Sequence, residues 1–340
     1  MAIGTAQSLG AFNYSGQIFD KTNIDTPLVS MLPRRNTSSV EFVVNSAYAS
    51  ENASRLSISE TASLTAPEPT YVTRVQETNV VQIFQYTTAV SYQKQANTGT
   101  LAGVNIAGQA NNVPNEFDFQ MAQKTKKARK DLELALIQST YKKAATDKEA
   151  NSTRGLIEAI KTTTKGLGNK ELDYDNISEV LRKMSKAGAD MNGLVIMCSA
   201  IGKAQITNNF SKLPGFYLPQ SRTVGGINID QIVTPAGTIG VMQYDNFLPE
   251  GIALIVNLGV LSIVEMPIPN KGNFFWEPLA KVGAGDKGML YGTAGLDYGP
   301  EWYHAKITGI ATTVTPLTPV TPATTVTPST AASETLTIQK

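Results

Sequence analysis

The sequence has few of the residues from which catalytic and metal sites are built. Its 340 residues include one histidine, His304, and one cysteine, Cys198. A zinc site needs several His, Cys or carboxylate ligands, and a catalytic triad needs a histidine beside its nucleophile. His304 stands next to aromatic residues, Trp302 and Tyr303, which is more typical of a packed strand than of a ligand. We therefore expect no enzyme activity, no metal and no cofactor.

A single cysteine also excludes an internal disulfide. Cys198 follows the apolar run Leu194–Met197, and this predicts a buried, unreactive thiol. Such a chain fits assembly in a reducing cytoplasm.

Neither an excess of one charge nor a long apolar run is present. The chain has 29 Lys and Arg against 28 Asp and Glu, a net charge of +1. This balance excludes a strong attraction of the whole molecule to nucleic acid or acidic membranes, although local patches remain possible. No apolar run reaches the roughly 20 residues that span a bilayer. Residues 1–7 lack the basic and apolar regions of a signal peptide. No membrane partner is expected.

One motif resembles a nucleotide-binding loop. Residues 283–288 spell G-x-G-x-x-G, but a dinucleotide site needs this loop between a strand and a helix. The residues that follow, 289–294, read as a strand. The sequence therefore favours a surface turn here.

The strongest pattern is an alternating strand over 84–92, which has the period-2 pattern of a half-buried strand. One face would carry Phe84, Tyr86, Thr88, Val90 and Tyr92, and the other Gln85, Thr87, Ala89 and Ser91. Val40, Phe42 and Val44 alternate in the same way and could form its hairpin partner. The loop between them, at about 48–70, is rich in Ser, Ala, Thr and Glu. Because an isolated hairpin is marginally stable in water, we expect this arm to rest on another subunit.

A long helix is predicted over 113–144, with Asn112 as its N-cap and Pro114 in its first turn. At about 1.5 Å per residue it would span roughly 40 Å, which suits a spine across a flat subunit. One side of the helix is apolar. That side comprises Phe117, Met121, Ala128, Leu132 and Ala135.

The opposite side of this helix is basic and is the only candidate site. It carries Lys124, Lys126, Lys127 and Lys130, which could face DNA without reading its sequence. The alternative is a solvated face with ion pairs four residues apart. These pairs would join Lys127 to Asp131 and Arg129 to Glu133.

The rest of the chain reads as a mixed α+β lobe followed by a tail. We expect a helix capped by Asp175 and closed by Gly188, a buried strand over 194–199, and a helix over 200–210. Strands follow at 229–233, 237–243, 252–257 and 261–266. From 312 onward the chain is rich in Thr and Pro. This tail is either disordered or ordered on a neighbouring subunit.

In this order the segments resemble the Hong Kong 97-type capsid fold of tailed bacteriophages. The resemblance covers about residues 1–311 and is greatest to the family of the major head protein of phage SU-ten, which residues 152–156 and 295–302 also resemble. It implies six segments. They are an N-terminal arm (1–38), an extended loop or β-hairpin (39–92), a peripheral lobe (93–174) with the spine helix (113–144), an axial lobe (175–265), a return to the peripheral lobe (266–311) and a Thr/Pro-rich C-terminal tail (312–340).

The resemblance implies a major capsid protein that forms hexamers and pentamers of an icosahedral head enclosing double-stranded DNA. Portal, scaffold and decoration proteins would be further partners, and the protein would lie in the virion after assembly in the host cytoplasm. Some relatives are joined by an isopeptide bond from a lysine in the extended loop. Here no lysine occurs between Lys21 and Lys94, so we expect no such bond.

Three alternatives remain open at this point. A non-viral shell of the same fold, such as an encapsulin, would enclose cargo proteins instead of DNA. A surface-layer or adhesin subunit would use the Thr/Pro segment as a stalk, and the expected lack of a signal peptide counts against it. An enzyme is disfavoured by the single histidine.

Overall fold

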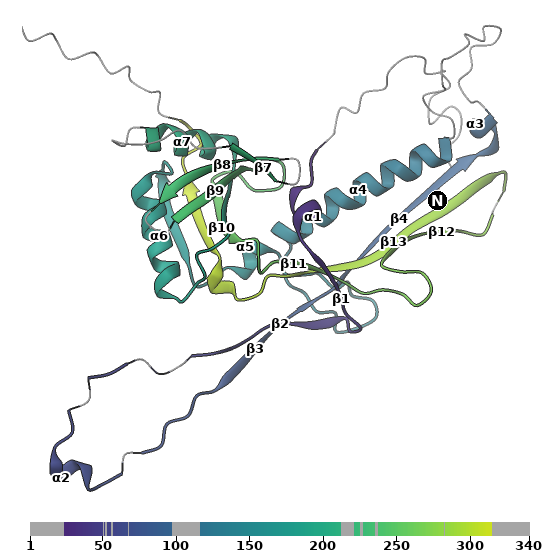
Figure 1. The fold of residues 1–340 in the computed structure, drawn as a ribbon. Helices are drawn as coiled ribbons and strands as arrows, with labels where there is room; N and C mark the ends of the chain where they lie inside the picture. Colours follow the sequence, from purple (N-terminus) through teal and green to yellow (C-terminus); the bar gives the residue numbers. More distant parts are fainter. Residues whose placement is uncertain are drawn as a thin grey trace, which may run out of the picture.

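The computed structural model describes residues 24–314 except 50, 52, 56, 67, 97–115, 212–220, 225–226, 235–236 and 282. It consists of two lobes and a long projecting arm (Figure 1). The helices are α1 (Pro27–Met31), α2 (Glu60–Ser63), α3 (Tyr92–Ala96), α4 (Glu116–Gln138), α5 (Leu156–Ala159), α6 (Tyr174–Lys186), α7 (Ala200–Ser211) and the 3-10 helix η1 (Glu301–Tyr303).

The strands form three sheets, and their order differs from their order in the sequence. The first seven are β1 (Arg34–Asn36), β2 (Glu41–Tyr48), β3 (Arg74–Val80), β4 (Gln82–Ser91), β5 (Thr164–Lys170), β6 (Leu194–Cys198) and β7 (Ser221–Val224). The others are β8 (Ile227–Thr234), β9 (Gly237–Gln243), β10 (Ile252–Asn257), β11 (Ser262–Glu265), β12 (Phe274–Pro278), β13 (Gly285–Asp297) and β14 (Ala305–Ile310).

One lobe is a five-stranded sheet with the long helix α4 lying along it (Figure 1). Its strand order is β1-β11-β13-β12, and β4 pairs with β13 on the side opposite β12. The even-numbered residues of β4 face the helix, where Phe84 is buried and the Tyr86 hydroxyl donates to Asp131 at 2.7 Å. The apolar side predicted for α4 is confirmed for Ala128, Leu132 and Ala135, which are buried.

The other lobe is a seven-stranded sheet of order β5-β14-β10-β6-β9-β8-β7. Helix α6 packs on it through Ile177, Val180, Leu181 and Met184, which are all buried. The helix is capped by Asp173 rather than by the predicted Asp175, because the Asp173 carboxylate accepts from the Asn176 N–H at 2.7 Å. The helix ends before Gly188, whose φ of 80° lies in the left-handed region that glycine adopts without strain.

The predicted partner of the strand over 84–92 was wrong. β2 pairs with β3 instead, and after Val81 the chain continues into β4, which pairs with β13 along its whole length. The hairpin therefore spans 41–80, and only the last part of the segment predicted as extended loop, residues 82–91, lies in the five-stranded sheet. The alternation correctly indicated a strand with one buried face, but it does not specify which partner the strand pairs with.

The long helix ends six residues earlier than the predicted 144. After Gln138 the backbone groups find partners outside the helix: Tyr141 N–H donates to Glu158 at 2.6 Å, and Lys142 pairs with Ser152 in an isolated bridge. Gly155 also donates its N–H to Ser139 O at 2.8 Å. These contacts replace the next helical turn. The predicted start, with Asn112 and Pro114, lies outside the described residues.

Two other segment boundaries differ from those predicted. Strand β11, at the end of the predicted 175–265 segment, pairs with β1 and β13 in the five-stranded sheet. Strand β14, at the end of 266–311, instead joins the seven-stranded sheet between β5 and β10. Both lobes are thus assembled from segments far apart in the sequence, and the chain crosses between them several times. Of the predicted tail, residues 312–314 are described.

Gly155→Ala tests the close approach that ends the helix. A Cβ at Gly155 would lie 2.7 Å from Ile137 O and 2.8 Å from Ser139 N, and both are backbone atoms. We expect the substitution to lower the free energy of unfolding by roughly 1–3 kcal/mol, measured by urea titration, because the backbone must shift. The matched control is Gly166→Ala, where the nearest atom is a Thr308 hydroxyl 3.8 Å away. Equal stability of the two variants would contradict this account.

Candidate assembly surfaces

The base of the β2–β3 hairpin is fixed to the five-stranded lobe. Phe42 is buried beside Val81 and Val264. The buried Asn79 side chain donates to Leu296 O at 2.7 Å and accepts from Arg154 N–H at 2.8 Å. The arm therefore leaves the lobe from a rigid, apolar root.

Two ion pairs hold this root from either side. Arg35 bonds to Asp297 at 2.7 Å and also donates to Val43 O at 3.2 Å. On the other side, Lys143 donates to Glu41 at 2.5 Å, and this hydrogen bond lowers the pKa of the Glu41 carboxyl. Arg35 and Lys143 are exposed and Glu41 is partly exposed, whereas Asp297 is mostly buried. Because solvent screens the exposed charges, each pair contributes little stability alone.

Beyond its root the hairpin has no support from the described part of the same chain. The register shifts between Val43 and Asn45, and the outer pairs run from Asn45–Glu77 to Tyr48–Arg74. Large apolar side chains are exposed here: Leu64 is 84% exposed and Tyr71 is 83% exposed. In Figure 1 the arm extends far from both lobes. Since exposed apolar side chains on such an arm mark an interaction surface, the arm is the first candidate.

Glu133 links three separate elements at the centre of the molecule. Its carboxylate is fully buried and accepts from the backbone N–H groups of Leu28 and Val29, each at 2.8 Å. It also accepts from the Tyr244 hydroxyl in the loop after β9. Burial raises the pKa of Glu133, and the hydrogen bonds from Tyr244, Val29 and Leu28 oppose this effect. The predicted Arg129–Glu133 surface pair was therefore wrong.

The sequence contained a signal for Glu133 that the prediction missed. Glu133 lies between Leu132 and Ala135 on the side of α4 that is otherwise apolar. The helical spacing therefore places its carboxylate among buried side chains and not in solvent. An acidic residue inside an apolar side of a helix indicates a buried acceptor that needs donors from elsewhere.

The four candidate lysines lie along α4 but differ in their surroundings. Lys126 and Lys127 are exposed, whereas Lys124 and Lys130 are half-buried. The predicted pair of Lys127 with Asp131 is confirmed at 3.1 Å, and Asp131 also accepts from Tyr86. The structure thus places these cations along one helix and engages Lys127 in a local ion pair.

The remaining sequence candidates have structural roles. His304 is buried; its Nε2 lies 2.8 Å from Tyr298 O, and its Nδ1 accepts from Asn257 N–H at 3.2 Å, so the neutral form is held and burial lowers its pKa to about 4. Burial also raises the pKa of the Cys198 thiol to about 12. The glycine motif at 283–288 is followed by a strand and not by a helix, as predicted. The predicted surface turn was wrong for residues 285–288, which already belong to β13 and pair with β4.

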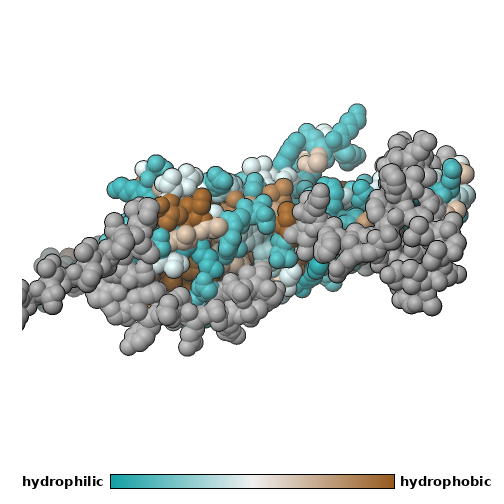
Figure 2. All heavy atoms as spheres, turned by 90° about the horizontal axis from the view of Figure 1, so that it is seen from above, coloured by the Kyte–Doolittle hydropathy of each residue, from teal (hydrophilic) through white to brown (hydrophobic). Residues whose placement is uncertain are grey.

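Within the described ranges no group of three or more His, Cys, Asp or Glu side chains could hold a metal ion. Among the same residues no helix is long and apolar enough to cross a membrane. Among the described residues seen from above, hydrophilic side chains predominate and apolar ones form separate patches (Figure 2).

Comparisons with known proteins settle what this arrangement is. Among curated proteins none matches the sequence. The family model of the SU10 major capsid protein matches residues 2–311. The chain belongs to this family. As a member it is a major capsid protein of tailed-phage type, a structural protein that self-assembles into shells and is located in the virion.

Solved structures of other shell-forming proteins have the same fold as this chain. The Cyanophage A-1(L) capsid protein is 15% identical, with a TM-score of 0.59 over 89% of this chain and 97% of its own. The SrpI encapsulin of Synechococcus elongatus PCC 7942 is 12% identical, with a TM-score of 0.58 over 92% and 96%. The capsid protein of Myoviridae phage XM1 is 11% identical, with a TM-score of 0.53 over 89% and 98%. The Hong Kong 97-type fold implied by the sequence is confirmed.

Glu133→Ala tests the central junction. It leaves the N–H groups of Leu28 and Val29 and the Tyr244 hydroxyl without their acceptor. We expect the free energy of unfolding to fall by about 3 kcal/mol or more, measured by urea titration of the subunit. The control is Arg129→Ala, an exposed position on the same helix, which should change stability little. Similar losses in both variants would contradict the assigned role.

The titration of Glu133 gives a second readout. Because its pKa is raised in the folded chain from an ordinary 4.5, its contribution to stability is present at low pH and is lost as the pH rises through the folded value. Glu133→Gln cannot titrate, so the stability of the parent chain relative to this variant should decline over that range. A difference that is independent of pH would contradict the raised pKa.

Proposed function

We propose that the chain forms hexamers and pentamers of the icosahedral head of a tailed bacteriophage, which encloses double-stranded DNA. The observation that carries the proposal is the β2–β3 arm: its root is rigid and buried, and its outer part exposes Leu64 and Tyr71. Such a surface is stabilised when it packs on a neighbouring copy. Assembly in the host cytoplasm belongs to the same proposal, and portal, scaffold and decoration proteins are its further partners.

In this proposal the five-stranded sheet with α4 is the peripheral lobe and the seven-stranded sheet is the axial lobe. The two share one apolar cluster, which includes Leu28 of α1, Leu136 of α4 and Val256 of β10. A continuous core supports a subunit that enters a shell as one rigid plate.

The protein's role in this proposal is structural, without catalysis. Cys198 and His304, the two candidates for reactive groups, have strongly shifted pKa values because they are buried in the core, and they are not grouped in a cleft. Cohesion of the shell comes from buried area and backbone pairing, since the hairpin segment contains no lysine for an isopeptide bond.

An encapsulin-like shell is the second candidate, because the SrpI encapsulin matches with a TM-score similar to that of the phage capsid. At 12% identity this likeness concerns the fold alone. The family match favours the phage capsid. Electron microscopy and nucleic-acid staining of purified particles separate the two, since DNA inside supports the phage head and an enclosed protein supports the alternative.

Shortening the arm tests its role in assembly. Replacing residues 47–75 by Asn-Gly joins β2 to β3 just past the Ser46–Gln76 pair through a two-residue turn. We expect a soluble, folded subunit that no longer forms shells, scored by circular dichroism and electron microscopy. Val233→Ser, which removes another exposed apolar side chain outside the arm, is the control and should assemble. Normal particles from the shortened chain would refute the arm's role.

The basic side of α4 is proposed to face the packaged DNA through Lys124, Lys126, Lys127 and Lys130. Replacing Lys126 and Lys130 by Gln removes two of these charges and should shorten the packaged genome or weaken particles at low salt, because fewer phosphate charges are offset. Lys148→Gln, at an exposed site away from the helix, is the control. Unchanged packaging would favour the solvated-face alternative.

A further inference from the structure

Strand β4 presents an open edge of the five-stranded sheet. Among the described residues its only strand neighbour is β13. Tyr92, directly after β4, donates its N–H to Ala284 O at 3.2 Å, and the register of the pair is continuous. Hydrogen-bonded pairs alternate in an antiparallel ladder, so the even-numbered residues of β4 bond to β13. Ile83 and Gln85 therefore direct their backbone groups outward.

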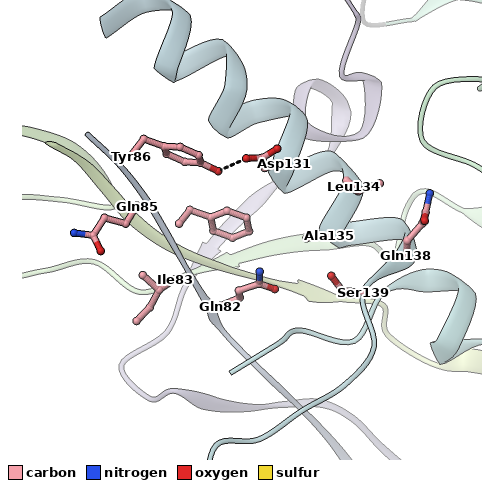
Figure 3. A pocket seen from close by; sticks show the side chains of 10 residues that line it. Gln82, Ile83, Gln85, Tyr86, Asp131, Leu134, Ala135, Gln138 and Ser139 are labelled. Atoms are coloured by element: carbon pink, nitrogen blue, oxygen red, sulfur yellow. Dashed lines mark hydrogen bonds between the residues drawn. The ribbon is translucent and has the colours of Figure 1, made fainter. Parts of the chain in front are cut away.

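A groove of about 500 Å³ runs beside this edge, between β4 and α4 (Figure 3). Its strand wall is residues 82–86, and its helix wall includes Leu134 and Gln138. Leu134 is 43% exposed on the helix wall, and Ile83, whose side chain lies on the face of the sheet away from α4, is 57% exposed beside the same edge. An open strand edge next to exposed apolar side chains is a template for an additional strand.

The groove is almost uncharged. Asp131 is the only charged residue among those that line it, and it already accepts from Tyr86 at 2.7 Å and pairs with Lys127 at 3.1 Å. The other polar lining residues are amides and hydroxyls, which suit an uncharged strand. A segment with several charges would leave them unpaired beside Ile83 and Leu134.

One segment of the chain has the matching composition. No charged residue occurs between Lys306 and Glu334, which is the longest uncharged stretch of the sequence. Within it, residues 323–327 (Ala-Thr-Thr-Val-Thr) contain no proline and are rich in Thr and Val, which favour strands. The hairpin tip is a poorer fit because it carries Glu51, Arg55, Glu60 and Glu68. The uncharged stretch 95–115 is rich in Gly, Asn and Ala, which strands disfavour.

Reach also agrees. The described chain ends at Val314 beside α7, where Gln205 donates to Thr313 O at 2.7 Å. From there to residue 323 an extended chain covers roughly 30 Å, at about 3.3 Å per residue. The segment is therefore not confined to the surface around α7, where the chain makes its last described contact.

We propose that residues 323–327 of a neighbouring copy add to the outer edge of β4 over Gln82–Tyr86, in the groove beside α4. The outward N–H and C=O groups of Ile83 and Gln85 pair with the added strand. The side chains of that strand cover Ile83 and Leu134. Prolines on either side, at 322 and 328, end the added strand because they lack the N–H that a ladder needs. The neighbouring copy is supplied by the shell, so this inference rests on the proposed function.

Disulfide trapping between copies tests the proposal. One chain carries Leu134→Cys, and a second, co-expressed chain carries a single cysteine at one of positions 323–327, for example Val326→Cys. Mild oxidation of particles that contain both chains should give a band at twice the 36.4 kDa chain mass on a non-reducing gel. Particles made of either chain alone should not give this band. Cys198 does not compete, since it is buried. Leu64→Cys in the hairpin tip and Val233→Cys on β8 are the matched controls for the donor and for the acceptor, and neither should give the band.

Hydrogen exchange gives an independent measurement. The amides of Ile83 and Gln85 should exchange more slowly, by roughly tenfold or more for one net hydrogen bond, in particles of the full chain than in particles truncated after Val314. Shells that give no trapped dimer at any of the five positions, or equal exchange with and without the tail, overturn this inference alone. A band with Leu64→Cys, or a trapped bond within one chain, overturns the assigned occupant. Failure to form shells overturns the proposed function together with it.

Discussion

The buried carboxylate of Glu133 is the interaction on which the arrangement of the subunit depends. It binds α1, the long helix and the loop after β9 at one point, and these elements are more than 100 residues apart in the sequence. A charged or polar acceptor in an apolar core is costly unless donors surround it. Only one relative placement of the three elements supplies all the donors, so the carboxylate selects that placement.

His304 makes a second junction of the same kind. It follows η1 and receives the N–H of Asn257 at the end of β10, while its other nitrogen lies against Tyr298 after β13. β10 belongs to the seven-stranded sheet and β13 to the five-stranded sheet, so the imidazole ties the two lobes together. The buried side chains of Glu133 and His304 thus hold separate elements in fixed relative positions. A subunit that is rigid at its centre transmits contacts from its arm and edges to the whole shell, which suits a closed assembly.

Local patterns predicted much of the fold, and long-range pairing was the part that they could not supply. The helices at 174–186 and 200–211 and four strands of the seven-stranded sheet, β6, β8, β9 and β10, follow from apolar periodicity and turn residues, whereas β5 and β7 were not predicted. The partner of β4 and the sheet of β14 were missed because a strand's period records which face is buried and not which strand lies beside it. The end of α4 was missed because no residue within the helix signals it. The helix ends because Gly155 donates its N–H to Ser139 O and the Glu158 carboxylate accepts from the Tyr141 N–H, so these backbone groups are not available to a further helical turn.

Of the two candidate assembly surfaces, the sequence predicted one and not the other. The hairpin was predictable, since a polar loop between two alternating strands has nothing within its own segment to pack on. The open edge of β4 was not predictable, because an edge strand can be recognised only when the order of the strands is known. A central strand can have the same sequence pattern as an edge strand. Among the described residues, β4 pairs with β13 on one side and with no strand on the other. The uncharged character of residues 307–333 becomes informative only beside this nearly uncharged edge. In the proposed assembly, specificity comes from unsatisfied backbone groups and from apolar surface, each of which needs a second copy to complete it.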